Sequence, residues 1–356
     1  MTVGSGEKRM TGPRLRVDLA QLLRNIDVMR ARLDPARFML VVKNDAYGQG
    51  VEAVVAAAAA HGVDWFGSFD VDTGIRTRAA TGEDARVFAW VTVDRPTIAA
   101  ALDARLDLGV GDAAYLEDVA AVSGGRGARV HLKVDTGLHR NGVRPEDWER
   151  FVARAAELER AGDIRVVGLW SHIAETSDAE DDASRALFHA AIEAARAAGL
   201  RPAVRHLSAS AASYARPEFR HDLARIGAFA YGIRSTDGPE LPGIVPTATL
   251  LAPVVDVRGD EAVVGLGFLD GLPSTLAGRA TLGTPGGVRA LRRVDATTLA
   301  VDAWPGARAG DEVAVFGPGA LGESSATTLA EAIGTVGEEI VVRVSPLIPR
   351  EHLPVA

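Results

Sequence analysis

Residues 38–50 read FMLVVKNDAYGQG, and this stretch decides the fold class that the sequence predicts. Its first five residues form an apolar run that is typical of a buried strand and ends directly before Lys43. An alanine-rich segment, VEAVVAAAAAHG (51–62), follows and predicts a helix that ends at Gly62. The stretch therefore predicts one strand–helix unit of a parallel sheet.

Further units of the same kind follow along the chain at a spacing of roughly 25 to 35 residues. We predict strands over 64–70, 85–91, 129–134, 164–170 and 203–208, with helices over 146–162 and 180–200 between them. No strand is followed by GxGxxG, and there is no P-loop, which disfavours the competing open doubly wound sheet. We therefore predict an α/β protein whose N-terminal part is a TIM-type (β/α)8 barrel.

After about residue 240 the sequence no longer alternates between strand-like and helix-like segments. LPGIVPTATL supplies two prolines and indicates a linker. Six short runs with glycine, proline and aspartate between them then predict strands: VVDVRG, EAVVGLG, GRATLG, TTLAVDA, DEVAVFG and EEIVVRVS. The predicted organisation is a flexible tail (1–12), a barrel (13–240) and a C-terminal all-β domain (241–356).

Composition narrows the class of protein. The 356 residues are 47% hydrophobic and 24% charged, with a net charge of −8, which disfavours a nucleic-acid or membrane partner. There is no cysteine, and the first twelve residues lack the apolar core of a signal peptide, so we expect a cytoplasmic protein. The histidines and carboxylates show no metal-ligand spacing, so no metal site is expected.

Polar residues follow the predicted strands where a parallel barrel carries its active site. They are Lys43, Arg140, Ser171-His172, Ser210 and Arg225. Lys43 is one of only three lysines in the chain, with Lys8 and Lys133. A lysine at the end of a buried strand is partly desolvated, which lowers its pKa and suits a Schiff-base or general-base role. The alternative is a structural lysine whose amine reaches solvent.

Several of these runs resemble signatures of the alanine racemases, a family of pyridoxal-phosphate enzymes with a barrel and a β domain. They are VVKNDAYGQG (41–50), KVDTGLHRNGV (133–143) and RIGAFAYGI (225–233), with RVDLAQLLRNI near the start and VRVSPLIPREH near the end. The resemblance implies pyridoxal 5′-phosphate as cofactor and a racemase-like isomerase that acts at the Cα of a small amino acid. It also implies a head-to-tail homodimer with shared active sites.

The resemblance also implies roles for single residues. Lys43 forms the Schiff base and acts as acid and base on one face of Cα, and Arg140 contacts the substrate carboxylate. The implied cofactor-binding residues are Tyr47, Ser210, Gly227 and Ala228 at the phosphate, Tyr231 in the same phosphate-side run, Arg225 at the pyridine nitrogen and His172 near the ring. Taken singly, Tyr47, His172 and Arg225 also fit structural roles. Lys133 either carries a carbamate, as in some relatives, or is an unmodified lysine paired with Asp135 or another carboxylate.

One half of the implied site departs from the family pattern. Alanine racemases use a second base, a tyrosine of the partner's β domain, but the last of the four tyrosines here is Tyr231. The matching segment, VVGLGFLDG, offers Leu266 or Phe268, and a phenyl ring cannot transfer a proton. Three hypotheses remain. They are a racemase with a substitute base (Asp270, His139 or His352), a one-base reaction such as retro-aldol cleavage or decarboxylation, and a non-catalytic cofactor-binding protein.

Overall fold

The computed structural model describes residues 12–91, 94–207 and 209–355, and these residues fall into two compact units. One unit comprises Met1–Leu22, Tyr47–Gln49 and Tyr231–Ala356, and the other comprises Leu23–Ala46 and Gly50–Ala230. We call them the β unit and the barrel unit. The two units interleave along the sequence, whereas the predicted domains are continuous ranges, whose limits stay a prediction. Of the predicted tail (1–12), residues 1–11 lie outside the described residues.

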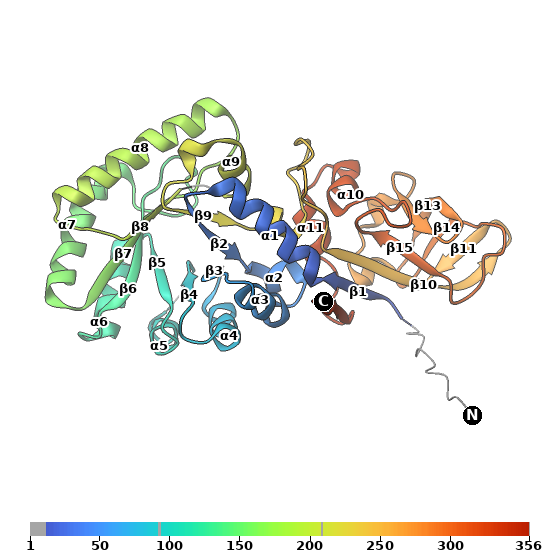
Figure 1. Cartoon of the computed structure of the whole chain (residues 1–356), viewed down its shortest axis with the longest axis horizontal. Helices are drawn as coiled ribbons and strands as arrows, with labels where there is room; N and C mark the ends of the chain where they lie inside the picture. Colours follow the sequence, from blue (N-terminus) through green and yellow to red (C-terminus); the bar gives the residue numbers. More distant parts are fainter. Residues whose placement is uncertain (1–11, 92–93, 208, 356) are drawn as a thin grey trace. The chain divides into compact units, whose positions relative to one another are not determined.

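The barrel unit contains an eight-stranded parallel sheet in the order β8-β7-β6-β5-β4-β3-β2-β9 (Figure 1). The strands are β2 (Arg37–Val41), β3 (Trp65–Ser68), β4 (Arg86–Ala89), β5 (Asp107–Val110), β6 (Ala128–Lys133), β7 (Ile164–Trp170), β8 (Val204–His206) and β9 (Leu223–Ile226). The outermost strands approach each other where Asp222 N donates to Arg205 O at 3.1 Å. The predicted fold class, a barrel-type parallel sheet with a β domain, is confirmed.

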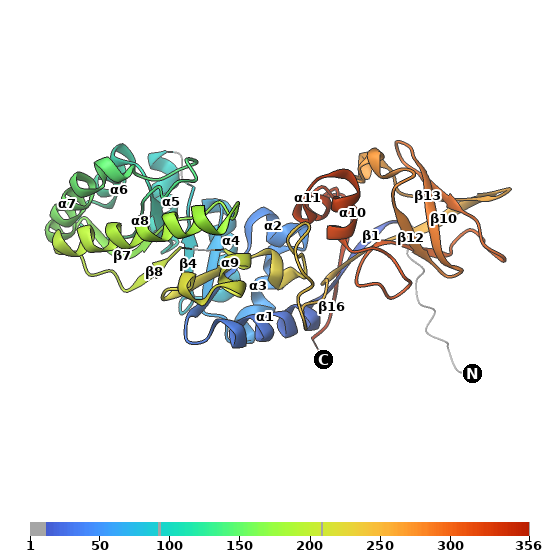
Figure 2. The ribbon, with the colours of Figure 1, turned by 90° about the horizontal axis from the view of Figure 1, so that it is seen from above.

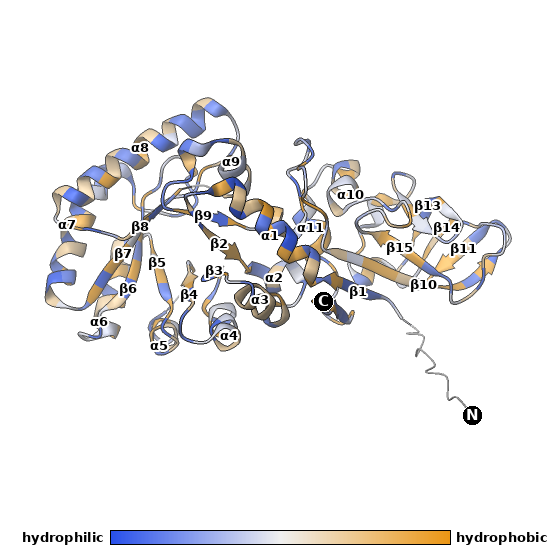
Figure 3. Cartoon of the chain, viewed as in Figure 1, coloured by the Kyte–Doolittle hydropathy of each residue, from blue (hydrophilic) through white to orange (hydrophobic). Residues whose placement is uncertain are grey.

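Helices alternate with these strands along the chain, and the first of them precedes β2. They are α1 (Leu19–Leu33), α3 (Val51–Ala60), α4 (Val71–Thr81), α5 (Arg95–Asp103), α6 (Ala113–Ser123), α7 (Pro145–Ala161), α8 (Asp178–Ala197) and α9 (Ser210–Ala215), with the short 3₁₀ helices η1 (Pro217–Phe219) and η2 (Ala228–Tyr231). Helices α7 and α8 lie side by side, as both ribbon views show (Figure 2). Polar and apolar residues alternate along them, whereas the strands beneath are mainly apolar (Figure 3). Their apolar sides, with Phe151 and Phe188, pack in the core.

The segment after β2 is not the loop that its glycines suggest. It forms a helical turn, α2 (Lys43–Gly48), in which Asn44, Asp45, Ala46 and Tyr47 all have φ between 53° and 57°. This is the left-handed conformation, which costs roughly 1–2 kcal/mol for each non-glycine residue. Such strain persists only where surrounding contacts enforce it, and it concentrates at functional sites.

The β unit contains a second, mostly antiparallel sheet in the order β11-β14-β13-β12-β15-β10-β1-β16. Its strands are β1 (Arg14–Asp18), β10 (Ala248–Arg258), β11 (Glu261–Val264), β12 (Thr281–Thr284), β13 (Gly287–Val294), β14 (Leu299–Asp302), β15 (Glu312–Phe316) and β16 (Arg350–Leu353). The first strand of the chain pairs here, antiparallel to β10 and parallel to β16, and not in the barrel.

One predicted strand of the β unit is wrong. Residues 338–345, EEIVVRVS, were expected to be extended because they are rich in β-branched residues, but α11 (Gly337–Val342) covers most of them. Glu338 and Glu339 lie in its first turn, where acidic side chains favour a helix, and Ile340 and Val341 are buried. Packing with α10 (Ala326–Ile333) thus overrides strand propensity. The remaining elements are the 3₁₀ turns η3 (Phe268–Asp270) and η4 (Ser274–Leu276).

A membrane-spanning helix is not found: within the described residues, no helix combines the length and the apolar character that crossing a bilayer requires.

Candidate active site

Lys43 directly follows β2 and opens the left-handed turn α2. Its side chain is half-buried, as predicted for a lysine at the end of a buried strand. The Asp45 carboxylate accepts from Val51 N at 3.1 Å, and Arg76 donates to Asp45 and to Glu52. These contacts tie the strained turn to the start of α3.

Arg225, on β9, is the most extensively bonded residue of the predicted site. Its guanidinium is buried and donates from Nη2 to the carbonyls of Ser171 and Leu207, both at 2.8 Å. Nη1 donates to His206 Nδ1 at 2.9 Å, and Nη2 lies 3.1 Å from His172 Nδ1. Burial lowers the pKa of Arg225 to about 9. Among the described residues, Nη1 has one acceptor, so its second N–H remains available to a ligand.

His172 marks the point where four cationic side chains converge. Its pKa lies well below the usual value, first because of burial and then because of the positive charges of Arg225, Arg140, Lys133 and Lys43. The imidazole is therefore neutral at neutral pH, and its Nδ1 can accept from Arg225. The structure thus brings together five of the residues that the sequence singled out.

Lys133, at the end of β6, is buried, with 5% of its surface exposed. Its Nζ lies 4.4 Å from the centre of the Trp170 ring. Burial, followed by the charges of Arg225 and Arg140, lowers its pKa to about 7. Within the described chain Lys133 makes no ion pair with a carboxylate, so the expected pairing with Asp135 is not observed.

The loop after β6 carries Arg140, which is exposed. Asp135, at the start of this loop, is buried and accepts from the backbone N–H groups of Gly137 and His139 at 3.1 and 3.0 Å. Arg144 Nη1 lies 3.3 Å from the same carboxylate. The Asp135 side chain therefore fixes the shape of the loop that presents Arg140.

Ser210 and Gly227 contact each other just beyond the carboxyl end of β9. Ser210, the first residue of α9, is buried, and its Oγ accepts from Gly227 N at 3.1 Å. Ala228 follows at the start of η2. A hydroxyl and adjacent backbone N–H groups at short helical turns form the kind of donor set that binds phosphate groups.

Tyr47 and Tyr231 belong to the β unit and contact each other, with ring centres 4.6 Å apart. Both are buried. In the same unit, Arg350 Nε donates to Gly48 O at 2.9 Å and His352 Nε2 donates to Gln49 O at 2.6 Å. The C-terminal strand β16 therefore holds the end of the left-handed turn.

The segment in which the family's second base is expected forms η3. Phe268 and Leu269 are exposed, by 48% and 67%. Phe268 N and Leu269 N donate to the carbonyls of Asp295 and Ala296, so this turn is held against the loop that precedes β14. The carboxylate of Asp270 accepts from Gly267 N at 2.9 Å and thus closes this turn. Asp270 thereby has a structural role.

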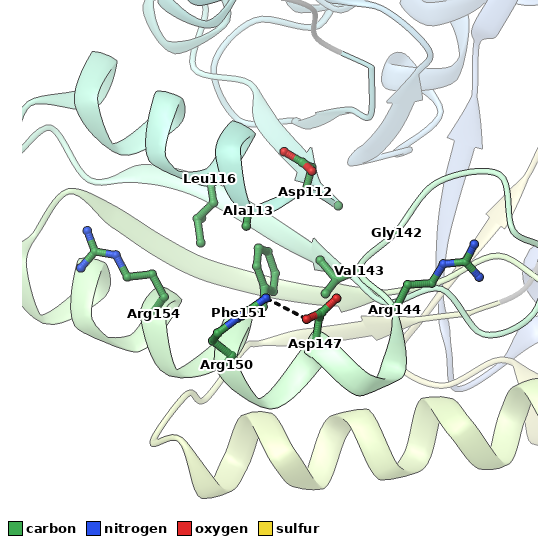
Figure 4. A pocket seen from close by; sticks show the side chains of 11 residues that line it. Asp112, Ala113, Leu116, Gly142, Val143, Arg144, Asp147, Arg150, Phe151 and Arg154 are labelled. Carbon is green, nitrogen blue, oxygen red and sulfur yellow. Dashed lines mark hydrogen bonds and ion pairs between the residues drawn. The ribbon is translucent and has the colours of Figure 1, made fainter.

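A separate cavity of about 480 Å³ lies between α6 and α7 (Figure 4). The side chains of Leu116, Val143 and Phe151 line it, and three arginines surround it. Each arginine has a carboxylate partner: Arg144 pairs with Asp135, Arg150 with Asp147, and Arg154 with Glu117 and Glu157. The cavity contains none of the predicted site residues. Among the residues that the structure describes, no cluster of three potential metal ligands occurs.

Sequence reasoning missed two residues that support the site. His131 and His206 lie on β6 and β8, are fully buried and contact each other through Nδ1 and Nε2 at 2.8 Å. As single histidines within apolar strands they resemble core residues. The only available signal was that both are polar residues in strands that face the barrel interior.

Comparisons with known proteins agree with this arrangement. The family profile "Alanine racemase, N-terminal domain" matches residues 17–235, and "Alanine racemase, C-terminal domain" matches residues 254–352. An alanine racemase of Thermobifida fusca is 36% identical over 367 residues, which cover 95% of this chain and 97% of that protein.

Solved structures show the same fold. The alanine racemase of a D-cycloserine-producing Streptomyces lavendulae superposes with a TM-score of 0.91 at 30% identity, covering 97% and 98% of the two chains. That of Bartonella henselae, described with covalently bound pyridoxal phosphate, has a TM-score of 0.86 at 17% identity, covering 97% of this chain and 100% of that one. The chain therefore belongs to the alanine racemase family, whose cofactor is pyridoxal 5′-phosphate.

Proposed function

We propose that this protein is a pyridoxal-phosphate-dependent racemase that acts at the Cα of a small amino acid, with Lys43 as the attachment point of the cofactor. The observation that carries the proposal is the convergence of Lys43, Lys133, Arg140 and Arg225 around the neutral His172. Such an excess of positive charge fits an anionic cofactor together with an amino-acid carboxylate.

The residues present fit this cofactor. Ser210, Gly227 and Ala228 offer a hydroxyl and backbone N–H groups for the phosphate, and the second N–H of Arg225 Nη1 is available for the ring nitrogen. Tyr47 and Tyr231 contribute hydroxyl groups to the phosphate side, and His172 packs near the ring. When bound, the cofactor supplies an electron sink that stabilises negative charge at Cα.

Each side chain then has one task in the proposed reaction. Arg140 binds the substrate carboxylate, for which a planar guanidinium offers two parallel donors. Lys43 removes or returns the proton on one face of Cα. Arg225 would donate a hydrogen bond to the ring nitrogen of a bound cofactor and would keep its proton, because its pKa of about 9 stays above neutral pH.

A second candidate function is a one-base reaction, such as retro-aldol cleavage or decarboxylation. It is favoured by the segment VVGLGFLDG, in which the family's second base is expected, because neither Leu266 nor Phe268 has a proton to transfer. A non-catalytic cofactor-binding protein is the third alternative, but a binder does not need Arg140 as a carboxylate clamp.

We further propose that two copies form a homodimer with shared sites in the cytoplasm. Among the described residues, Phe268, Leu269 and Leu347 are large hydrophobic side chains exposed by 48%, 67% and 90%. Ser345 N donates to Asp270 O at 2.9 Å, so the segments that carry these side chains are joined. Exposed apolar side chains that gather on one part of a protein mark interaction sites.

Incubation with L-alanine or L-serine in deuterated water tests the function. A racemase exchanges the Cα hydrogen and produces the D-enantiomer. Exchange with retained configuration would contradict racemisation and support the one-base alternative, and no exchange with bound cofactor would support the third. The control is Lys43→Ala, which should show neither exchange nor the absorbance band of the bound cofactor.

A further inference from the structure

A buried chain of polar side chains runs from Arg225 through the interior of the barrel unit to Asp107. Arg225 Nη1 lies 2.9 Å from His206 Nδ1, and His206 Nε2 lies 2.8 Å from His131 Nδ1. His131 Nε2 in turn lies 3.5 Å from Asp107 Oδ2. Asp107, His131 and His206 are each at most 1% exposed. The site described above uses only the Arg225 end of this chain.

The two ends of the chain fix the direction of every hydrogen bond in it. A guanidinium has only donors, so His206 Nδ1 must accept and the proton of His206 must sit on Nε2. That proton is donated to His131 Nδ1, so the proton of His131 also sits on Nε2 and faces the Asp107 carboxylate. A carboxylate accepts only, so it enforces the same direction from the far end.

Two features of strands β6 and β7 make space for these side chains. A Cβ on Gly168, in β7, would lie 2.0 Å from His131 Nδ1, so only glycine fits beside that imidazole. The pairing of β6 with β7 also shifts register between Val130 and His131, which is a β-bulge. Bulges re-aim side chains and are retained features of a fold.

The surroundings make the direction of the chain costly to reverse. The ring of Phe88 lies 4.6 Å from that of His131 and 5.4 Å from that of His206, and Trp170 stacks on His206 at 5.7 Å. If the direction were reversed at one contact, two N–H donors would face each other. In this apolar environment neither could bond to water instead, so a full hydrogen bond would be lost. At the far end, Arg129 donates to both oxygens of Asp107, at 2.5 and 2.9 Å.

We propose that Asp107 and His131 are positioning residues for Arg225: by fixing the tautomer of His206, they orient the guanidinium that faces the cofactor ring. The inference rests on the proposed function only for the role of Arg225. The tautomers of His131 and His206, and their dependence on Asp107, do not depend on the proposed function.

The test is ¹⁵N NMR of histidine-labelled protein loaded with pyridoxal phosphate, with signals assigned through His131→Phe and His206→Gln. We expect both histidines to be neutral, with the proton on Nε2. In Asp107→Asn, Arg129 binds the amide oxygen and the amide N–H₂ turns toward His131 Nε2. His131 should then carry its proton on Nδ1, and its hydrogen bond to His206 should break or reverse.

The matched control is Arg129→Gln, which leaves the carboxylate and should leave both tautomers unchanged. We expect Asp107→Asn to lower the rate of Cα hydrogen exchange about tenfold, and the control to change it little. If Asp107→Asn does not fold, His131→Phe keeps an aromatic ring in place and tests the same rate effect.

Three results would overturn the proposal. They are a proton on Nδ1 of either histidine in the native protein, unchanged tautomers in Asp107→Asn, and changed tautomers with an unchanged exchange rate. A protein that binds no pyridoxal phosphate would overturn the proposed function, and the tautomers would still be readable in that protein.

Discussion

Lys133 shows how burial alone changes the chemistry of a residue at this site. With 5% of its surface exposed and two arginines nearby, it has a pKa of about 7, against an ordinary value of 10.5. Above neutral pH it is therefore an uncharged amine. Asp135, which is held by His139 and Arg144, raises the pKa of Lys133 and so offsets this effect, but only in small part. An uncharged amine is also the form that can take up carbon dioxide, so the carbamate hypothesis for Lys133 stays open.

This pKa predicts how stability depends on pH. Between pH 7 and 10.5 the unfolded chain binds one proton more than the folded chain at Lys133, so its contribution to the free energy of unfolding rises with pH. In carbon-dioxide-free buffer, the wild type should gain about 3 kcal/mol over Lys133→Met between pH 7 and 9.5. Urea unfolding at the two pH values measures this difference, and a constant difference would contradict the assigned pKa.

The sequence predicted the charged residues of the site better than the two buried histidines that support them. Lys43, Arg140 and Arg225 stand out because each follows or ends a strand and belongs to a recognisable run. His131 and His206 lie in the middle of apolar strands, so only the structure shows that they contact each other and Arg225. Spacing along one chain cannot reveal a contact between residues 75 positions apart.

Among the elements, the left-handed turn α2 is the most unusual. Four consecutive non-glycine residues with positive φ cost roughly 4–8 kcal/mol in total, so contacts elsewhere must hold the turn. In the β unit, Arg350 Nε donates to Gly48 O, and in the barrel unit Val51 N donates to the Asp45 carboxylate. The turn fixes the backbone direction immediately after Lys43.

Asn44 allows this strain to be measured, because its side chain is exposed and its φ is 53°. Asn44→Val places a β-branched residue in the left-handed region and should lower the free energy of unfolding by about 1–2 kcal/mol. Asn44→Gly, the matched variant, should leave stability unchanged or raise it. Chemical denaturation decides, and a Val variant as stable as the Gly variant would contradict the assigned conformation.

Elements were predicted where a periodic hydrophobic pattern extends over many residues, and some were missed where the apolar run is short. Helices α7 and α8 were predicted because their periodic patterns extend over several turns. The four-residue strand β5 was not predicted, because so short an apolar run carries no clear period. The sheet to which β1 belongs depends on pairing with residues more than 200 positions away, which the sequence does not reveal.

At the scale of the whole molecule, the sequence predicts that the two units keep the family pattern to different degrees. The barrel unit contains Lys43, Arg140 and Arg225, whereas the segment VVGLGFLDG of the β unit contains no tyrosine. Of the whole site, the sequence therefore predicted the barrel half directly. For the other half it predicted which group is missing, but the substrate depends on pocket walls that a single chain does not provide.

Phe268→Tyr tests whether the missing phenol limits inversion. A positioned general acid or base contributes roughly 10²–10⁴-fold to a rate. The variant should therefore produce the D-enantiomer at least tenfold faster than the wild type, while its rate of cofactor binding stays unchanged. Phe268→Leu is the matched control and should show no gain. An unchanged rate of inversion in Phe268→Tyr would mean that the second proton is moved by another group.

The proposed homodimer predicts that charge on the exposed apolar segment weakens association. Leu347→Glu and Leu269→Glu should raise the dissociation constant of the dimer at least tenfold, a loss of about 1.4 kcal/mol each. Val255→Glu, at another side chain exposed by about half, is the control and should have little effect. Sedimentation over a concentration series gives the constants, and equal association of all variants would place the interface elsewhere.

The central claim is that Lys43 holds the cofactor, and the scarcity of lysine makes it directly testable. Treatment of the loaded protein with borohydride reduces the bond between cofactor and amine, and peptide mass spectrometry then locates the label among Lys8, Lys43 and Lys133. We expect the phosphopyridoxyl group on Lys43 alone and no label in Lys43→Ala. A label on Lys133 or Lys8, or no label after pyridoxal phosphate has been added, would contradict it.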